Sequence, residues 1–297
     1  MTAELQAAND TLLEKRDEFA RNGFVRLPGV LSAEECADMV AVMDRLDAET
    51  EFNTHERARQ PGDVLELHNC VTRDPLFLDL IDRPEVLEVL GFLMGCNIQL
   101  GSSHCFIRPP AERSVSLEAQ GGFSWHIDLG PTAVPVNGRL PHLATRVGYV
   151  FTSVNQPDMG SISVVPGSHR VAGPPAQNPA TGQPYGAIEI LAEAGDAIIF
   201  DNRLWHSTMP NYSGQARKNL YMEYAPRWLR PFDYYRYDED FLAGASDVRK
   251  QLLGFDFTDI LDGGLGYQQP HDVDLPLRRW LADRGLTDVP LIAPELP

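Results

Sequence analysis

Hydrophobic residues in the first third of the chain recur at helical spacing, between residues that begin or end helices. Leucine and phenylalanine side chains repeat in this way from about residue 3 to residue 22, and Gly23 follows as a typical helix end. Ser32, with Glu35 three residues later, forms the capping-box pattern of a helix start. The elements predicted here are a helix over 3–22, a strand at Phe24–Leu27, a helix ending near Glu49, and two helices opened by Asp74-Pro75, divided by Pro84 and ended by Gly95.

The pattern changes after Gly95, where short β-branched or aromatic runs alternate with clusters of glycine, proline and asparagine. Runs of this kind predict strands joined by turns. The expected strands are Ile98–Arg108, Phe123–Asp128, Thr145–Val154, Ser161–Val165, Ile188–Leu191, Ala197–Asp201, Leu204–Thr208 and Arg217–Tyr224. Eight short strands favour a jelly roll built from two sheets.

Helical spacing returns in the last part of the chain, at Val248–Leu253 and Leu275–Arg284. No repeat, low-complexity tract or linker divides the sequence. The predicted fold class is therefore mainly β with flanking helices. We expect a single domain over 1–297, with a β core at about 98–225 and helices covering one face.

Composition limits the partners and the compartment. The 297 residues are 43% hydrophobic and 23% charged, as in folded globular proteins. A formal net charge of −17 repels phosphate backbones and anionic lipid surfaces, so neither nucleic acid nor a membrane is expected as a partner. The charged N-terminus lacks the apolar core of a secretory signal, and no apolar run approaches the roughly 20 residues that span a bilayer. We therefore predict a cytoplasmic protein. Its four cysteines lack CxxC spacing and are expected to be reduced thiols.

One short segment, Ser124-Trp125-His126-Ile127-Asp128, has the spacing of a metal site. On an extended strand, His126 and Asp128 would point to the same side and offer a nitrogen and a carboxylate oxygen to one point. They would form two thirds of a 2-His-1-carboxylate site, the arrangement that holds non-haem Fe(II). A surface histidine beside a strand-end aspartate is the alternative explanation.

A later segment could complete this site. After the apolar run from Gly195 to Asp201, a second predicted strand carries His206, placed to supply the third ligand. Arg217 follows 11 positions after His206, and a hairpin would return its guanidinium toward the metal. A buried arginine there fits a carboxylate, since its fork of donors matches two oxygens. A solvated cation at a strand end is the alternative.

The order of the motifs resembles the phytanoyl-CoA dioxygenase (PhyH) family. The matching residues are Trp125-His126-Ile127-Asp128, Val164–His169 (V-x-P-G-S-H), Gly195–Asp201, Trp205-His206, Pro210–Ser213 and Arg217. With the N-terminal pattern around Gly23 and Leu31–Cys36, the resemblance covers roughly residues 19–228. Two departures are Met159-Gly160-Ser161-Ile162, where the family often has N-G-x-L, and Asn219, where it often has a hydroxyl residue. Trp125–Asp128 also resembles ectoine hydroxylases, but their acidic-aromatic continuation is replaced by Leu129–Thr132, so ectoine is not inferred as substrate.

The resemblance implies a double-stranded β-helix, a cupin-like jelly roll, that uses Fe(II), 2-oxoglutarate and dioxygen. It implies that His126, Asp128 and His206 are the iron ligands and that Arg217 pairs with the distal carboxylate of 2-oxoglutarate. Further candidates for contact with the cosubstrate are Asn219, Tyr149 and His104, although core roles explain Tyr149 and His104 equally well. His169 in the Pro-Gly-Ser-His turn is expected to be structural, and His68 to have no role in a site.

The predicted function is oxidation of a small molecule, with hydroxylation favoured because Asp128 is present where related halogenases lack a carboxylate. The expected setting is bacterial secondary metabolism. The expected lid elements are Leu129–Thr145, Val171–Gly186 and Trp228–Tyr235, with Arg139, Arg146 and Arg230 as candidates for an anionic substrate or as solvated cations. Two alternatives remain: a non-catalytic or regulatory jelly roll that binds a metal or a small acid, and a cupin-like metal enzyme without 2-oxoglutarate. The sequence does not indicate an oligomeric state.

Overall fold

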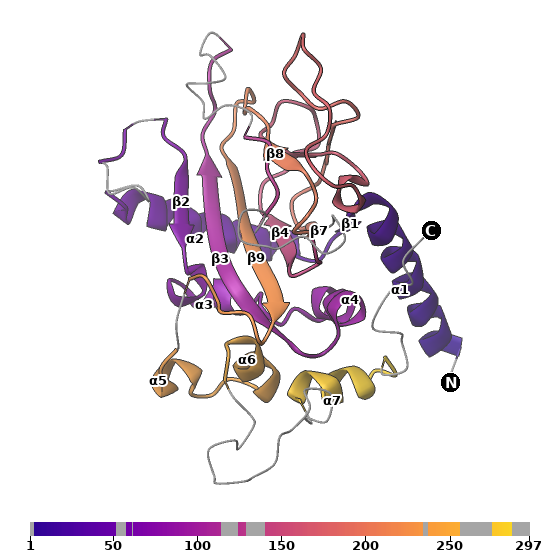
Figure 1. The fold of residues 1–297 in the computed structure, drawn as a ribbon. Helices are drawn as coiled ribbons and strands as arrows, with labels where there is room; N and C mark the ends of the chain where they lie inside the picture. The colour runs from indigo at the N-terminus through magenta and orange to yellow at the C-terminus, as the bar shows by residue number, and fades with distance from the viewer. Residues whose placement is uncertain are drawn as a thin grey trace.

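A six-stranded antiparallel sheet forms the centre of the fold (Figure 1). The computed structural model describes residues 3–51, 58–60, 62–113, 124–128, 140–233, 237–255 and 275–286. The large sheet has the order β1-β7-β4-β9-β3-β2. Its strands are β1 (Phe24–Leu27), β2 (Leu65–His68), β3 (Ile98–Arg108), β4 (Thr145–Val150), β7 (Ala197–Asp201) and β9 (Arg217–Pro226).

A second, three-stranded antiparallel sheet has the order β6-β5-β8. Its strands are β5 (Ile162–Val164), β6 (Ile188–Glu189) and β8 (His206–Thr208). Apolar side chains of both sheets, among them Val150, Ile162 and Ile198, form one hydrophobic cluster between them. The space between the sheets is therefore closed by packing at this cluster, as in a jelly roll.

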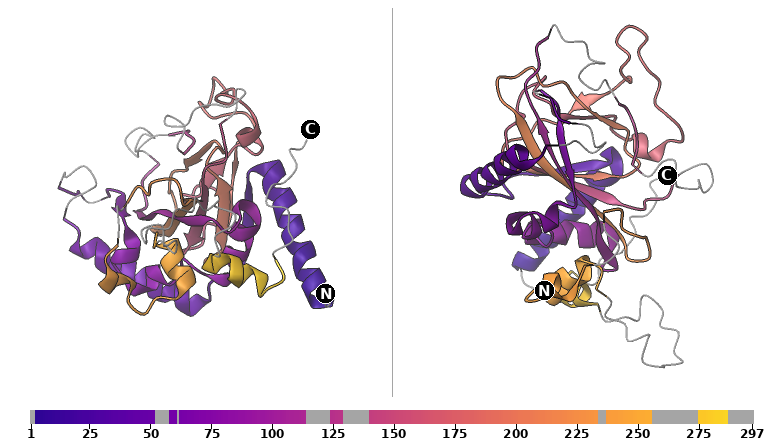
Figure 2. Two further views of the ribbon diagram at one scale, coloured as in Figure 1. Left: turned by 60° about the horizontal axis from the view of Figure 1, so that its bottom comes forward. Right: turned by 90° about the vertical axis from the view of Figure 1, so that its left-hand side faces the viewer.

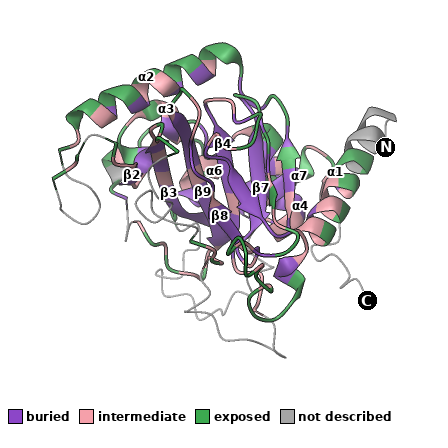
Figure 3. Cartoon of the chain, turned by 90° about the horizontal axis from the view of Figure 1, so that it is seen from above, coloured by how far each residue is buried: buried purple, intermediate pink, exposed green. Residues whose placement is uncertain are grey.

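Helices cover the opposite face of the large sheet (Figure 3). On that face a larger cluster of buried side chains joins the sheet and the helices. The helices are α1 (Ala3–Asn22), α2 (Ala33–Glu49), α3 (Pro75–Leu78), α4 (Pro84–Met94), α5 (Glu239–Leu242), α6 (Asp247–Leu252) and α7 (Pro276–Ala282), with 3-10 turns η1 (Cys70–Thr72) and η3 (Ser168–Arg170). The last three helices gather at one end of the sheet (Figure 2). None of the described helices has the length and apolar character needed to cross a bilayer.

Local signals placed the N-terminal elements correctly. α1 ends at Gly23, whose φ of +82° is the left-handed conformation that glycine adopts most easily. The capping box of α2 is present, because the Ser32 hydroxyl accepts from Glu35 N at 3.2 Å and Ser32 N donates to the Glu35 carboxylate at 2.7 Å. The strands at Phe24–Leu27, Ile98–Arg108 and Ala197–Asp201 have their predicted bounds.

Other sequence predictions need correction. The expected strand at Phe123–Asp128 is wrong over the described residues 124–128, which contain a single β-bridge at His126. β4, β5, β6 and β8 are shorter than predicted, while β9 extends to Pro226. The strand β2 and the short helix α5 were not predicted. The four cysteines are free thiols, as expected.

Candidate functional site

Two histidines distant in sequence are joined through their backbones. His126 N donates to His206 O at 3.0 Å, and His206 N donates to His126 O at the same distance. This bridge ties the loop that contains His126 to the first residue of β8. The two imidazole rings consequently lie 4.3 Å apart between centroids.

Each ring is oriented by a carbonyl two residues before it. His126 Nδ1 lies 2.6 Å from Ser124 O, and His206 Nδ1 lies 2.8 Å from Leu204 O. A proton on Nδ1 would donate to these carbonyls and leave the lone pair on Nε2. Metal-binding histidines are commonly fixed in this way by a hydrogen bond from the other ring nitrogen.

Both Nε2 atoms face the carboxylate of Asp128. Its Oδ1 lies 3.8 Å from His126 Nε2, and its Oδ2 lies 3.9 Å from His206 Nε2. One donor atom from each residue falls within 4.8 Å of the other two. The three residues therefore meet the geometric requirement for a shared metal ion, with His126 half-exposed and the other two buried.

Arg146 on β4 forms an ion pair with Asp128. Its Nε lies 2.6 Å from Asp128 Oδ2, as a close ion pair without hydrogen-bond geometry, and its Nη2 lies 3.3 Å from Glu223 Oε2. The candidacy of Arg146 as a solvated lid cation is therefore wrong. Its sequence position next to the predicted lid gave no sign that strand pairing turns it toward Asp128.

Burial and charge set the protonation of this group. Burial alone would raise the pKa of Asp128, but Arg146 holds that pKa below its ordinary range, so the carboxylate is ionised at neutral pH. Burial lowers the pKa of His206 to about 4, which keeps its ring neutral. Burial raises the pKa of Glu223, with Arg146 opposing the shift. An ionised aspartate and a neutral histidine are the forms that bind a metal.

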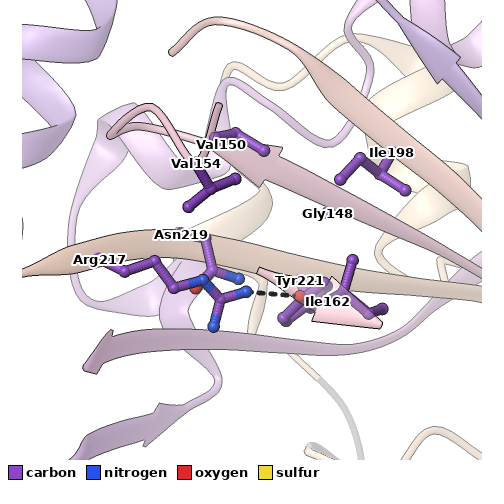
Figure 4. A pocket seen from close by; sticks show the side chains of 8 residues that line it. All are labelled: Gly148, Val150, Val154, Ile162, Ile198, Arg217, Asn219 and Tyr221. Atoms are coloured by element: carbon purple, nitrogen blue, oxygen red, sulfur yellow. Dashed lines mark hydrogen bonds between the residues drawn. The ribbon is translucent and has the colours of Figure 1, made fainter. Parts of the chain in front are cut away.

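A small pocket lies between the sheets (Figure 4). Two of its lining residues, Gly148 on β4 and Tyr221 on β9, lie two positions along their strands from Arg146 and Glu223. Apolar side chains form most of its wall, and the polar contributions come from β9. The lining residues are Gly148, Val150, Val154, Ile162, Ile198, Arg217, Asn219 and Tyr221. Arg217 is 7% exposed and its Nη2 donates to the Tyr221 hydroxyl at 2.8 Å. The buried Asn219 amide has neither its oxygen nor its nitrogen hydrogen-bonded among the described residues.

Arg108 adds a second guanidinium to the same end of the site, and the sequence reading missed it. It lies opposite Arg217 in the β3–β9 pairing. Burial, together with the charge of Arg217, lowers the pKa of Arg108 to about 10, which leaves it charged at neutral pH. Gly160 has a φ of +77°, and a Cβ there would lie 3.3 Å from Arg108 Cδ and 3.5 Å from Arg217 Cδ. The glycine in the divergent Met159–Ile162 motif thus leaves room for both arginine stems.

Arg217 reaches the site by a different route from the predicted hairpin. β8, which begins at His206, pairs with β5 in the small sheet, whereas β9 pairs with β3 and β4 in the large sheet. The chain therefore crosses between sheets after His206. The ring of Phe200 lies near both His206 and the pocket residue Tyr221. Its centroid is 5.1 Å from that of the His206 ring and 6.1 Å from that of the Tyr221 ring.

The prediction that Tyr149 lines the cosubstrate pocket is wrong. Its neighbours Gly148 and Val150 line the pocket, and side chains alternate between the faces of a strand. Tyr149 is fully buried in the cluster on the helix side, where its hydroxyl donates to Leu80 O at 2.8 Å.

His104 and His169 also have defined partners. His104 lies next to Tyr221 in the β3–β9 pairing, but its Nε2 lies 3.0 Å from Asp233 Oδ1, so the structure does not bring it to the Arg217 pocket. His169 has a buried ring whose Nε2 lies 3.2 Å from Ala20 O, which agrees with a structural role. Of the expected lid elements, 129–139 and 234–236 lie outside the described residues, so Arg139 does as well.

Comparison with known proteins gives a consistent result. The phytanoyl-CoA dioxygenase (PhyH) family model matches residues 19–219. An ectoine dioxygenase of Nocardia farcinica is 25% identical over 238 residues, which cover 70% of this chain and 76% of that protein. A dioxygenase of Aspergillus fumigatus is 21% identical over 275 residues, or 90% of this chain and 82% of that protein.

Solved structures share the fold. The epimerase SnoN, in complex with Fe3+, α-ketoglutarate and a nogalamycin compound, has a TM-score of 0.57 at 19% identity and covers 74% of this chain and 85% of its own. HygX from Streptomyces hygroscopicus, with nickel and 2-oxoglutarate bound, has a TM-score of 0.57 at 18% identity, covering 77% and 92%.

A jelly roll with a His-x-Asp…His donor set beside a buried arginine defines the class of Fe(II)- and 2-oxoglutarate-dependent oxygenases. The match over residues 19–219 includes all three donors and Arg217. This chain belongs to the phytanoyl-CoA dioxygenase (PhyH) family.

Proposed function

We propose that His126, Asp128 and His206 hold Fe(II) and that the protein hydroxylates a small organic molecule. The observation that carries this proposal is the shared orientation of the two histidines, each with Nδ1 at a backbone carbonyl and Nε2 toward Asp128. Two imidazoles and one carboxylate suit iron and leave other coordination positions open. When bound, the iron with dioxygen and 2-oxoglutarate supplies the oxidising chemistry, which converts 2-oxoglutarate to succinate and carbon dioxide.

Arg146 is the positioning residue for the carboxylate. Its guanidinium contacts Oδ2 of Asp128 and neutralises part of the charge that burial would otherwise disfavour. The second contact, to Glu223, fixes the guanidinium from the other side. Asp128 is therefore held in one orientation before a metal binds, which lowers the ordering entropy that binding must overcome.

Arg217 would bind the distal carboxylate of 2-oxoglutarate. Its guanidinium is buried, it is oriented by the Tyr221 hydroxyl, and Arg108 lies beside it. A dicarboxylate placed here would lay its methylene groups against Val150, Val154 and Ile198 and could hydrogen-bond to the Asn219 amide. A pocket that is apolar except for these polar groups at one end supports an enzyme that uses 2-oxoglutarate over a cupin-like metal enzyme that does not.

The substrate class follows only in part from the relatives. Ectoine dioxygenases, the epimerase SnoN and HygX point to a small organic substrate, and we propose one for this chain. Ectoine itself is not proposed, because identity to those relatives is 25% or less in the alignments reported above and the residues after Asp128 differ from the ectoine pattern. A cytoplasmic location stays a prediction.

The proposal is tested by iron-dependent turnover. Anaerobically purified protein, loaded with Fe(II) and given 2-oxoglutarate and dioxygen, is expected to release succinate slowly, and a true substrate among candidate metabolites should accelerate this release. Metal-free protein is the control. A non-catalytic, metal-binding jelly roll would bind iron yet release no succinate beyond that control with any candidate.

A further inference from the structure

A second group of histidines and carboxylates lies toward the β2 edge of the large sheet, on the same face as the pocket that contains Arg217. His68 on β2 and His104 on β3 are direct partners in the strand pairing, with ring centroids 4.1 Å apart. Glu66 lies two residues before His68 and shares its face. Leu65 and Leu67, which alternate with Glu66 and His68 along β2, are buried in the helix-side cluster, so Glu66 and His68 face away from the helices.

Asp233 approaches this group from a segment after β9, here called the return segment and comprising residues 227–233. Phe232 N donates to Gly101 O at 2.8 Å and so ties the segment to β3. The Asp233 side chain is 4% exposed. Its Oδ2 accepts from Ser103 N at 2.6 Å and from Asn69 N at 3.1 Å, which fixes the carboxylate.

The other oxygen of Asp233 is directed at both histidines. Oδ1 lies 3.0 Å from His104 Nε2 and 3.7 Å from His68 Nδ1. On the far side of His68, Nε2 lies 3.3 Å from Glu66 Oε1. One donor atom each from Glu66, His68 and His104 can be chosen so that all three lie within 4.8 Å of one another.

The charges of this group are unbalanced within the part of the chain that the structure describes. The ion-pair partners of Glu66 and Asp233 are histidines only, with no lysine or arginine within 4.0 Å. The carboxylate of Glu66 and the imidazoles of His68 and His104 make a donor set that suits a divalent cation. Asp233, at His104 Nε2, is placed as the outer carboxylate that orients a metal-binding histidine. Donors bound to tetrahedral zinc at about 2.0–2.2 Å are separated by about 3.4 Å. Glu66 Oε1 and His68 Nε2, at 3.3 Å, lie close to this separation. Asp233 Oδ1 faces the other nitrogen of His68, Nδ1, at 3.7 Å, so it lies outside the three-residue donor set.

We propose that Glu66, His68 and His104 form a second divalent-cation site of the zinc type, separate from the iron site, with Asp233 as the partner that orients His104. Its ligands come from β2 and β3, so a bound ion would hold the two paired strands together at this edge of the large sheet, and the return segment would supply the orienting carboxylate. An Asp233–His104 hydrogen bond without a metal is the competing explanation. That pair, however, gives no role to Glu66 or to the alignment of His68.

Zinc binding to protein without a working iron site tests the proposal. The double variant His126→Ala/His206→Ala removes two of the three iron-site donors and leaves the second group intact. Titrated with ZnCl2 against a chromophoric chelator, this variant is expected to bind about one equivalent. Its thermal midpoint should rise with zinc, because a ligand that binds only the folded state stabilises it.

Variants of the second group supply the specific result. In the double-variant background, His68→Ala should weaken zinc binding by at least about tenfold, as loss of even an outer-shell partner often does. Glu66→Gln, which keeps size and removes charge, should also weaken it. Glu34→Gln, at an exposed carboxylate on α2, is the matched control and should change nothing. Cobalt in place of zinc should show the visible absorption of a four-coordinate ion.

Two results would overturn this second site. The double variant could bind no zinc, or it could bind zinc with an affinity that His68→Ala and Glu66→Gln leave unchanged. Either result would leave the group as a metal-free anchor of the return segment. Neither would bear on the iron site, which wild-type protein reports separately through succinate release.

Discussion

At the scale of single residues, the contacts of Asp128 indicate that this residue contributes more to metal binding than to the stability of the fold. The Asp128 side chain is buried, yet the contacts of its carboxylate among the described residues are with Arg146 and with the two histidines of the candidate iron site. A carboxylate with such contacts adds little to the hydrophobic core. Its removal should therefore affect metal binding more than the free energy of unfolding.

For Asp128→Ala we expect loss of product formation and weakened Fe(II) binding, with a far-UV circular dichroism spectrum close to that of the wild type. Arg146 would lose Asp128 but keep its contact with Glu223, so the loss of stability is expected to stay below the roughly 3–5 kcal/mol seen when a buried charge is left without a partner. Product analysis by mass spectrometry checks the chemistry. Hydroxylated product at the wild-type rate would contradict the assignment of Asp128.

Arg217 has a different expected effect, because its proposed partner is the cosubstrate and not the metal. Arg217→Ala should raise the apparent Michaelis constant for 2-oxoglutarate by about one to two orders of magnitude, since a charge-assisted pair contributes roughly 1.5–3 kcal/mol. Iron affinity should stay nearly constant. Arg45→Ala, at a half-exposed surface ion pair on α2, is the matched control. Unchanged dependence on 2-oxoglutarate would make Arg217 a structural cation.

His169 gives a prediction about pH. Burial lowers its pKa below the ordinary 6.5, and no partner of Nδ1 is present among the described residues. As pH falls below 6.5, the unfolded chain takes up a proton that the folded chain resists, so stability falls. This residue contributes at most about 1.4 kcal/mol per pH unit. His169→Gln should flatten the decline of the free energy of unfolding, measured in urea, below pH 6.5 and leave its slope above pH 7.5 unchanged. Equal slopes in the wild type and the variant below pH 6.5 would assign the decline to other groups.

At the scale of elements, the helices and long strands could be predicted because their signals are local. The glycine after α1 and the capping box of α2 depend only on residues adjacent in sequence. The first correctly predicted where α1 ends, and the second where α2 begins. β2 was missed because four residues, Leu65–His68, form a strand only through pairing with β3. The strand predicted over residues 124–128 is the opposite error. The aromatic run there suggested a strand, but it makes one β-bridge and no ladder.

The pairing of β4 with β9 offers a test at this scale. A Cβ added at Gly148 would lie 2.5 Å from Tyr221 Cε1, and the Tyr221 hydroxyl accepts from Arg217. Gly148→Ala should therefore displace the tyrosine ring, lower stability by about 1–3 kcal/mol and raise the Michaelis constant for 2-oxoglutarate. Urea unfolding and steady-state kinetics measure the two effects.

Gly214→Ala is the matched control for this substitution, because no atom lies within 4 Å of a Cβ placed there. It should leave both quantities nearly unchanged. Equal effects of the two substitutions would show that glycine replacement in general is harmful. In that case the contact between Gly148 and Tyr221 would not be responsible.

At the scale of the whole molecule, the site depends on bringing two sheets face to face. His206 belongs to the small sheet, and Arg217 and Arg146 belong to the large one. Motif order pointed to these residues, but neither the exchange between sheets nor the contact of Arg146 with Asp128 can be derived from spacing. Arg108 and Glu223 were missed for the same reason, since their relevance arises from strand register.

The central claim is that one space between the sheets holds both Fe(II) and 2-oxoglutarate. The most direct measurement is the difference absorption spectrum of anaerobic protein with Fe(II) when 2-oxoglutarate is added. We expect a weak visible charge-transfer band in wild-type protein, loss of the band in His126→Ala/His206→Ala, and a higher half-saturating 2-oxoglutarate concentration in Arg217→Ala. Iron-loaded wild-type protein without the band, or the same band in the histidine double variant, would contradict it.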